Sequence, residues 1–319
     1  MEFPIELKNA IEARAAEIGL GRLKALAEEL SLRYRRQTGQ GKKLLTQPEE
    51  AVAYAATRMP ATFGAVYAAL FAALTEADLS PKTLLDVGAG TGAACWAAAA
   101  LCDFSRITCL ERESAMKNLG QALMREGAPA LQRAVWKTAD LTKDSIEGAD
   151  LVIASYVLGE MTDAERKIAL QKLWNAAGEM LLLVEPGTPA GFAQLREIRE
   201  ELLATGAHIA APCPHEEKCR LEKDDWCHFT CRVPRSQLHK LLKQGDAPYE
   251  DEKFAYLALA KSETNKPEAR ILRHPKIAKG RITLELCGRG ENASITVTKK
   301  DGARFKAARK AKNGDIFEG

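Results

Sequence analysis

A cysteine-rich segment in the second half of the chain carries the residue types best suited to hold a metal. In APCPHEEKCRLEKDDWCHFTCR (211–232), gaps of five, seven and three residues separate Cys213, Cys219, Cys227 and Cys231. A segment so rich in proline and charge has little apolar content with which to fold alone, so a bound metal would order it. Four thiolates can hold a tetrahedral zinc ion or a [4Fe–4S] cluster. We therefore expect a metal centre here rather than a set of unconnected buried thiols.

The residues alone leave the fourth ligand open. Cys231 falls within a predicted strand, 228–233, where alternate side chains face opposite sides. Cys287 is distant in sequence, but docking of the C-terminal region could bring it to the loop. His215 and His228 are further ligands that a zinc ion accepts.

A glycine-rich turn is the second group that could do chemistry. LLDVGAGTG (84–92) follows a predicted buried strand and precedes a helix, and contains Gly88, Gly90 and Gly92. Glycines let the chain turn tightly and approach a ligand, while the start of the helix offers N–H groups to a carboxylate. Dinucleotide sites share this context, but the pattern Asp-x-Gly-x-Gly-Thr-Gly, from Asp86, resembles the first motif of methyltransferases more closely. We expect this turn to bind S-adenosylmethionine.

Two acids support a cofactor site at the same sheet edge. Glu111 ends the second predicted strand, about 20 residues beyond the turn, where a carboxylate would accept hydrogen bonds from both ribose hydroxyls. Asp140 follows the third predicted strand and is a candidate adenine contact, with an ordinary loop acid as the alternative.

The sequence does not identify a catalytic group. Many base N-methyltransferases carry an Asn/Asp-Pro-Pro-aromatic element after the fourth strand, whereas this chain has ASYVLGEM, with the polar residues Ser155, Tyr156 and Glu160. None of the three is an evident general base or amine clamp. The pair Pro212–Cys213 could indicate a nucleophilic cysteine for cytosine C5 methylation, but it lies after the fifth strand and among other cysteines. The catalytic residues therefore stay unknown.

Alternating strands and helices must position both groups. Apolar strands are predicted at 83–87, 106–111, 133–138, 150–156 and 180–185, and helices at 92–102, 113–126, 163–177 and 190–205. Such alternation indicates a parallel sheet covered on both faces. Two more strands, 228–233 and 253–260, flank a helix at 235–243 and fit the antiparallel edge of a seven-stranded sheet. The predicted fold class is α/β, a class I S-adenosylmethionine methyltransferase-like (Rossmann-like) sheet.

Three regions follow from this pattern. Residues 1–80 are predicted to form an N-terminal helical region. Residues 81–260 are predicted to form the methyltransferase-like domain, with a cysteine-rich insertion at 206–231. Residues 261–319 are predicted to form a small basic β appendage. Its expected strands are 281–288, 293–300 and 303–310.

The net charge of +3 conceals an asymmetry along the chain. Residues 261–319 hold 15 Lys or Arg against 7 Asp or Glu, a net charge of +8, which leaves −5 for the rest. A basic block of this kind is typical of proteins that bind a phosphate backbone, and a solvated tail is the alternative.

The beginning of the chain and its hydropathy indicate where the protein acts. MEFPIELKNAIEAR carries acids and has no apolar h-region, which argues against a secretory signal or a transit peptide. By inspection, no apolar run approaches the roughly 18 residues that span a bilayer. We expect a cytoplasmic protein that is monomeric and does not bind membranes.

Three runs of residues resemble a known family. VEPGTPAGF (184–192), CPHEEKC (213–219) and WCHF (226–229), followed by a cysteine in a basic β appendage, resemble the Rsm22 family. This family includes the mitochondrial methyltransferase-like factors of small ribosomal subunit assembly and their bacterial relatives, and the lack of a transit peptide suits a bacterial member. The resemblance covers nearly the whole chain, and the Cys-Pro-His element is its most diagnostic part.

The resemblance implies a methyltransferase-like domain, a [4Fe–4S] cluster and binding to immature small-subunit ribosomal RNA or a pre-ribosomal particle. The ligand pattern of the family, three cysteines in the loop and one in the appendage, would leave Cys231 as a core thiol. The implied ligands are Cys213, Cys219, Cys227 and Cys287. Two functions remain: an S-adenosylmethionine-dependent methyltransferase of ribosomal RNA, or a non-catalytic assembly factor that binds ribosomal RNA.

Overall fold

Helices form most of the described residues in the first quarter of the chain. The computed structural model describes residues 2–37, 47–222, 224–243 and 245–318. Its N-terminal helices are α1 (Ile5–Ile18), α2 (Leu20–Gln37), α3 (Pro48–Thr57) and α4 (Met59–Ala77). Gly19, at φ +86°, separates α1 from α2, because few other residues adopt that conformation. Proline in the first turn starts both α3 and α4, where its missing N–H costs nothing.

Helix α4 is apolar throughout and corrects one expectation. Its 19 residues, with a mean hydropathy of 1.2, are long and apolar enough to cross a membrane by length and composition. Alanine and aromatic residues form about half of this helix, so the sequence does not show it as a run of large aliphatic side chains. The helix packs against β8 and α5, and 61% of its apolar window is buried inside the protein. In this fold α4 is a core helix.

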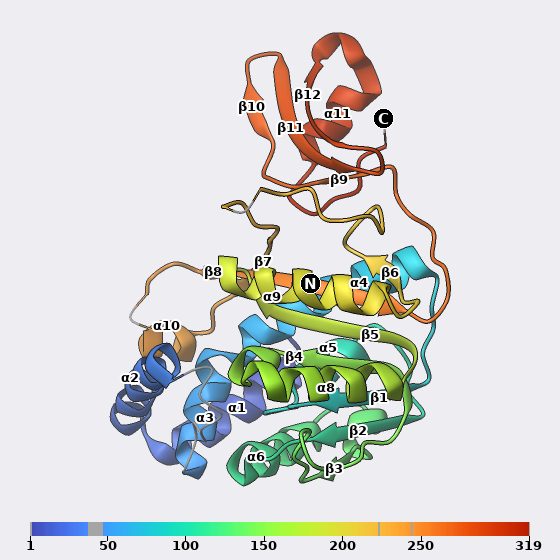
Figure 1. Cartoon of the computed structure of the whole chain (residues 1–319). Helices are drawn as coiled ribbons and strands as arrows, with labels where there is room; N and C mark the ends of the chain where they lie inside the picture. The colour runs from blue at the N-terminus through green and yellow to red at the C-terminus, as the bar shows by residue number, and fades with distance from the viewer. Residues whose placement is uncertain (1, 38–46, 223, 244, 319) are drawn as a thin grey trace.

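A mixed sheet forms the centre of the molecule (Figure 1). Its strands are β1 (Thr83–Val87), β2 (Arg106–Leu110), β3 (Val135–Lys137), β4 (Ala149–Ser155), β5 (Ala177–Pro186), β6 (His208–Ala211), β7 (Phe229–Pro234) and β8 (Tyr249–Ala260). Their order is β3-β2-β1-β4-β5-β8-β6, and β7 also pairs with β8. Strands β1 to β5 are mutually parallel, and β8 runs antiparallel to β5. This order confirms the predicted class I methyltransferase-like fold.

The far edge of the sheet differs from the prediction. The sheet has eight strands rather than seven, because β6 and β7 share the long strand β8. Strand β6 pairs with the last residues of β8, from Ala258 to Ala260, and β7 with the first, from Tyr249 to Phe254. The predicted insertion at 206–231 thus contains β6 and the start of β7. A four-residue strand leading into Pro212 gave too short an apolar run to be recognised.

Helices cover both faces of the sheet. They are α5 (Ala93–Ala99), α6 (Ser114–Met124), α7 (Pro129–Gln132), α8 (Asp163–Ala176), α9 (Pro189–Leu203) and α10 (Gln237–Lys243), with the short 3-10 helix η1 (Leu158–Glu160). Successive residues of β4 face opposite cores: Leu151 packs with α4 and α5, and Val152 with α8 and α9. Figure 1 shows α8 and α9 on one side of the sheet and α4 and α5 on the other.

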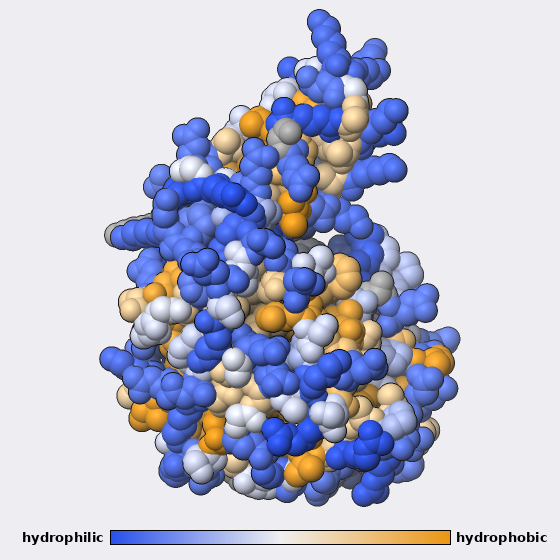
Figure 2. Space-filling view, turned by 90° about the vertical axis from the view of Figure 1, so that its right-hand side faces the viewer, coloured by the Kyte–Doolittle hydropathy of each residue, from blue (hydrophilic) through white to orange (hydrophobic). Residues whose placement is uncertain are grey.

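The C-terminal region is a separate small layer with its own core. It contains β9 (Ala269–Ile271), β10 (Lys276–Ala278), β11 (Arg281–Gly288), β12 (Asn292–Thr298), the 3-10 helix η2 (Lys299–Asp301) and α11 (Gly302–Lys310). Strands β9, β10 and β12 all pair antiparallel to β11. Figure 2 shows this region as a projecting lobe with mostly hydrophilic side chains.

The predicted strand at 303–310 is wrong, because these residues form α11. The segment ARFKAARK contains Ala, Arg and Lys, which are strong helix formers, and no β-branched residue. Phe305 and Ala308, three positions apart, bring one helix face onto the core formed by the strands.

Candidate cofactor site and metal centre

The glycine turn between β1 and α5 has a backbone that only glycine adopts readily. Gly88, Gly90 and Gly92 have φ of +68°, +56° and +85°. A Cβ on Gly88 would lie 2.6 Å from Cγ2 of Val157, and one on Gly92 would lie 2.6 Å from Cε of Met124. The turn therefore packs tightly against the segment after β4 and against α6.

Glu111 holds this turn in place. Its Oε2 accepts a hydrogen bond from the Gly90 N–H at 2.7 Å, and its Oε1 accepts one from the Glu113 N–H at 2.7 Å. Burial raises the pKa of the Glu111 carboxyl, although these two backbone N–H groups act in the opposite direction. The carboxylate also faces a cavity, so it can accept hydrogen bonds from a ligand while it clamps the loop.

A cavity of about 310 Å³ opens at the carboxyl ends of β1, β2 and β4. Its size falls within the range of small-molecule and cofactor sites. Four of the residues predicted from sequence line it: Gly88, Gly90, Glu111 and Asp140. The site lies where the strand order reverses between β1 and β4, which is where ligands bind in open α/β sheets.

Two predicted cofactor residues lie outside the lining of this cavity. Gly92 starts α5 and packs against Met124 and Trp136. Asp86 is fully buried, and its Oδ2 accepts a hydrogen bond from the Cys95 thiol at 3.3 Å. Burial raises the pKa of Asp86 to about 7. Both residues thus support the turn from the side that faces away from the cavity.

Unsatisfied polar atoms also surround the turn. Within the described residues, Oδ1 of Asp86 and Oγ1 of Thr91 are buried and have no hydrogen-bond partner. Buried polar atoms in folded proteins nearly always have partners, so these two oxygens are unusual. Neither residue lines the 310 Å³ cavity, so ordered water beside the turn is the partner that these oxygens fit.

Asp140 binds its own turn. Its Oδ1 accepts hydrogen bonds from the Thr142 N–H at 3.0 Å and from the Thr142 hydroxyl at 2.6 Å. Thr142 and Lys143 lower the pKa of the Asp140 carboxyl to about 2. The carboxylate is charged at neutral pH and lines the cavity, but its local partners account for much of its hydrogen-bonding capacity.

A larger cavity of about 910 Å³ adjoins the first and shares Tyr54, Tyr156 and Glu160 with it. It also contains Glu185, which the sequence reasoning missed. This residue is 1% exposed, and its Oε1 accepts a hydrogen bond from the Leu158 N–H at 3.1 Å. It is the last acid of β5, so its position at the carboxyl end of a parallel strand could have identified it, as it did Glu111.

Tyr156 connects this cavity to the N-terminal helices. Its φ of +57° is uncommon for a residue with a side chain, and such strain clusters at functional sites. The Tyr156 hydroxyl donates to Oε1 of Glu252 at 3.3 Å, and Arg58, between α3 and α4, donates to the same oxygen at 3.1 Å. The strained end of β4 is therefore tied to the helical region that covers the cavity.

Glu185→Gln should change how stability depends on pH. Burial raises the pKa of Glu185 from its ordinary value of 4.5 to about 8. Between these pH values the folded state keeps a proton that the unfolded state loses, so this group lowers stability as pH rises. The Gln variant lacks this loss. As the pH rises from 4.5 to 8.5, its free energy of unfolding should therefore increase by on the order of 3 kcal/mol relative to that of the natural chain. Urea denaturation across this range measures the difference.

The control for this prediction is Glu200→Gln, which changes an exposed glutamate on α9. The free energy of unfolding of this control should depend on pH in the same way as that of the natural chain. Parallel profiles for Glu185→Gln and the natural chain would contradict the prediction.

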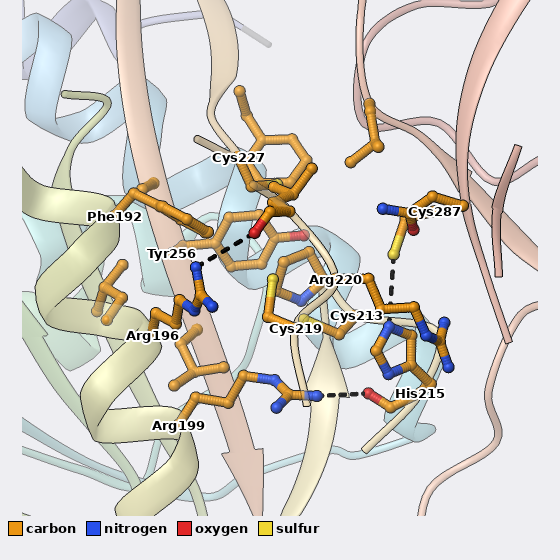
Figure 3. A pocket seen from close by; sticks show the side chains of 18 residues that line it. Phe192, Arg196, Arg199, Cys213, His215, Cys219, Arg220, Cys227, Tyr256 and Cys287 are labelled. Carbon is orange, nitrogen blue, oxygen red and sulfur yellow. Dashed lines mark hydrogen bonds between the residues drawn. The ribbon is translucent and has the colours of Figure 1, made fainter. Parts of the chain in front are cut away.

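Four cysteines from two distant segments line a second pocket (Figure 3). Cys213, Cys219 and Cys227 come from the loop between β6 and β7, and Cys287 comes from β11. Cys231 lies elsewhere, buried in the main core. The structure therefore brings the loop and the appendage together at one place.

The environment of Cys227 and Cys287 keeps these two thiols protonated in the absence of a metal. Burial, together with the neighbouring Cys213 and Cys219, raises the pKa of Cys287 to about 12. Burial and the other three thiols also raise the pKa of Cys227 well above its usual value. A metal must displace these protons, so metal binding would weaken as the pH falls.

Basic side chains surround the pocket and hold the loop. Nη2 of Arg199 donates to the carbonyl oxygens of His215 at 2.9 Å and Glu217 at 2.6 Å, and its Nε has no partner in the described part of the chain. Arg220 donates to the Gly288 carbonyl at 3.0 Å, which joins the loop to the appendage. His215 Nε2 lies 3.6 Å from the Cys287 sulfur. This cationic lining suits an anionic centre such as a metal bound by four thiolates.

The thiols do not converge closely enough to define the metal site. Across the described residues, no group of three or more His, Cys, Asp or Glu side chains could hold a metal ion. The four cysteines share a pocket without the close approach that a tetrahedral zinc site requires. The ligand set thus stays a prediction.

Comparison with known proteins places these features in context. The family model described as mitochondrial small ribosomal subunit Rsm22 matches residues 48–318. The human mitochondrial ribosome assembly protein METTL17 is 26% identical over 290 residues, covering 83% of this chain and 61% of its own length. The Rsm22-cox11 tandem protein 2 of Schizosaccharomyces pombe is 23% identical over 330 residues, covering 86% of this chain and 44% of its own length. The chain thus spans less than two thirds of the length of each of these relatives.

Solved structures resemble the chain at the level of the fold. The magnesium protoporphyrin IX methyltransferase of Synechocystis, crystallised with its bound methyl donor, is 18% identical. The match covers 73% of this chain and 91% of that protein, with a TM-score of 0.42.

Proposed function

The chain belongs to the Rsm22 family, and from this membership we propose that it is an assembly factor of the small ribosomal subunit. In this proposal the protein binds ribosomal RNA, S-adenosylmethionine and a [4Fe–4S] cluster. The match of the family model to residues 48–318 and the similarity to a mitochondrial ribosome assembly protein support the ribosomal role.

The observation that carries the RNA partner is the cationic surface of the appendage. Residues 261–319 have a net charge of +8, whereas the rest of the chain is acidic. Lys306, Arg309 and Lys310 of α11 are all exposed. The lobe that the appendage forms is mostly hydrophilic (Figure 2). Such a surface would attract a phosphate backbone, whereas the acidic remainder of the protein would repel it.

Replacing three appendage cations should flatten the salt dependence of RNA binding. The variant Lys306→Gln, Arg309→Gln and Lys310→Gln removes charges that would displace counterions from RNA phosphates. The slope of log affinity against log salt should decrease in magnitude by about 2 to 3. Filter binding of a small-subunit ribosomal RNA fragment at several salt concentrations measures this slope.

The matched control removes three exposed cations from the methyltransferase-like domain: Arg125, Arg133 and Lys167, each replaced by Gln. It has the same net charge as the test variant, so it separates a local contact from a general charge effect. An equal change in both variants would mean that the appendage has no special part, and no RNA binding by the natural chain would reject the RNA-binding function.

The cofactor cavity supports S-adenosylmethionine as the small ligand. Gly88 and Gly90 would let the ligand approach the backbone, and Glu111 would accept hydrogen bonds from the ribose. When bound, this cofactor would supply an electrophilic methyl group. The residues of this chain would bind and orient it in a partly enclosed site.

The cysteine pocket supports a four-thiolate centre. Cys213, Cys219, Cys227 and Cys287 would hold a [4Fe–4S] cluster, with zinc as the alternative, and thereby fix the appendage to the methyltransferase-like domain. A cube separates its four thiolates more widely than a single zinc ion does, because each thiolate binds a different iron.

Methylation of ribosomal RNA is the second candidate function, and the 910 Å³ cavity favours it. This cavity adjoins the proposed cofactor site and is large enough for a second ligand. The segment after β4 still offers no amine clamp, so we place assembly first. Incubation with radiolabelled S-adenosylmethionine and small-subunit RNA from assembly intermediates separates the two: labelled RNA would establish methyl transfer, and cofactor binding without transfer would reject it.

A further inference from the structure

A cluster of basic groups lies between β7, α10 and the N-terminal helices, outside both sites described above. His239 on α10 is 1% exposed, and its Nε2 lies 3.2 Å from Oε2 of Glu250. Arg235 donates to the same oxygen at 3.2 Å, and Lys243 donates to both Glu250 oxygens at 2.6 and 2.8 Å. One carboxylate therefore serves three basic side chains.

Three buried nitrogens of this cluster make no hydrogen bond within the described residues: Nε of Arg235 and both ring nitrogens of His239. Nε2 of His239 does lie 3.2 Å from Glu250, which leaves Nε of Arg235 and Nδ1 of His239 without a partner. Buried polar atoms are rarely left in this state, because losing water without a replacement costs free energy. Since Glu250 already takes Nη2 of Arg235 and faces Nε2 of His239, these two nitrogens are available for another acceptor.

A cavity of about 200 Å³ is lined by the two residues that carry these nitrogens, Arg235 and His239. Arg235, Ser236 and His239 line it together with Lys8 and Glu12 of α1. The remaining lining is mostly apolar and comprises Phe3, Ile11, Ala55, Ala56, Pro60, Pro234 and Leu238. The polar groups are therefore gathered on part of a small, largely apolar cavity, as in many ligand sites.

The donor set of this cavity favours an oxyanion. Arg235 Nε carries a hydrogen, and His239 Nδ1 does so when the ring is charged. The Ser236 oxygen accepts from the His239 N–H at 3.1 Å, which leaves its own hydrogen free to donate. Lys8 contributes a positive charge at the rim, and its contact with Glu12 is long at 3.9 Å. A bound cation would face mostly positive groups, whereas a phosphate or a similar anion would satisfy the unpartnered donors.

We propose that this cavity binds the phosphate group of a nucleotide, of RNA or of free inorganic phosphate. Arg235, Ser236 and His239 would hold the phosphate oxygens, and Lys8 would close the site from α1. A phosphate held here would join the N-terminal helix to the segment that follows β7. The site is separate from the cofactor cavity and from the cysteine pocket, and it does not depend on the proposed function.

The direct test is binding of inorganic phosphate to the full-length protein by titration calorimetry at constant ionic strength, with chloride as the reference anion. Arg235→Gln should weaken phosphate binding at least about tenfold, because it removes a charged donor. Lys8→Gln, at the rim, should weaken it by about two- to fivefold without disturbing the buried cluster. This rim variant keeps the test valid if Arg235→Gln fails to fold.

The matched control is Arg232→Gln, which removes an exposed arginine of β7 that pairs with Asp251 outside the cavity. It should bind phosphate as the natural chain does. Absence of saturable phosphate binding by the natural chain, or equal affinities in the Lys8→Gln and Arg232→Gln variants, would overturn the proposal.

Competition experiments then identify the source of the phosphate. Adenosine monophosphate that displaces inorganic phosphate would indicate a nucleotide site, and RNA that displaces it would indicate a backbone contact. Displacement that requires a 5′-phosphate on the RNA would indicate recognition of an RNA end. If neither ligand competes, the site is one for inorganic phosphate itself.

Discussion

Arg270→Met is expected to lower the free energy of unfolding by about 3 to 5 kcal/mol. Arg270 in β9 is 3% exposed and forms an ion pair with Glu76 of α4, whose side chain is also buried. It also donates to the Pro212 carbonyl and, at 2.7 Å, to the Gly314 carbonyl. The variant leaves the Glu76 carboxylate buried without its partner, which is the costly state. Urea denaturation followed by circular dichroism measures the loss.

A double variant separates the cost of an orphaned charge from the value of the pair. Glu76→Leu with Arg270→Met removes both charges, and apolar replacements of buried pairs are often close to neutral, so most of the lost stability should return. Arg289→Met is the surface control, because the side chain of this exposed residue donates to the Pro267 carbonyl and is not part of the buried pair. Equal stabilities of the two single variants would show that the buried pair does not anchor the appendage.

The glycine turn illustrates what the sequence could predict. Its residues are consecutive, and the positive φ of Gly88, Gly90 and Gly92 is a local requirement that the glycine spacing reveals. Glu111 was placed by its position at the end of a strand, and it does line the cavity. The roles of Asp86 and Gly92 were less accessible, because spacing shows that they belong to the turn but not that they support it from behind.

The interactions that sequence reasoning missed are mainly long-range. Arg270 and Glu76 are 194 residues apart, and neither has a pattern that indicates its partner. Strand β6 was missed because its identity depends on pairing with β8 rather than on its four residues. In the sequence Glu185 is simply the end of an apolar strand, and only the structure shows that it lines a cavity. In each case, tertiary contacts supplied the information that the local pattern lacked.

Cys287→Ser should remove most of the metal centre, whereas Cys231→Ser should retain it. The two cysteines lie on sheet strands, but Cys287 faces the pocket shared with the loop cysteines and Cys231 lies in the main core. Serine is nearly the same size as cysteine but is a poor ligand for iron. After purification without oxygen, Cys287→Ser should contain on the order of tenfold less iron than the natural chain, with loss of the broad visible absorption.

The comparison between these two variants tests the ligand choice independently of the identity of the metal. Each substitution removes one sulfur, which is buried in Cys231 and half-buried in Cys287, so a general packing defect should affect Cys231→Ser at least as much. Cluster loss in Cys231→Ser alone would transfer the fourth ligand to that residue, and a colourless natural protein with stoichiometric zinc would replace the cluster by a zinc site.

Because Cys287 pairs with Arg270 across β11 and β9, loss of the centre should also loosen the appendage that the Arg270–Glu76 pair anchors. Combining Cys287→Ser with Arg270→Met should therefore show a stability change that differs from the sum of the single changes, since neighbouring residues that stabilise one interface do not act independently.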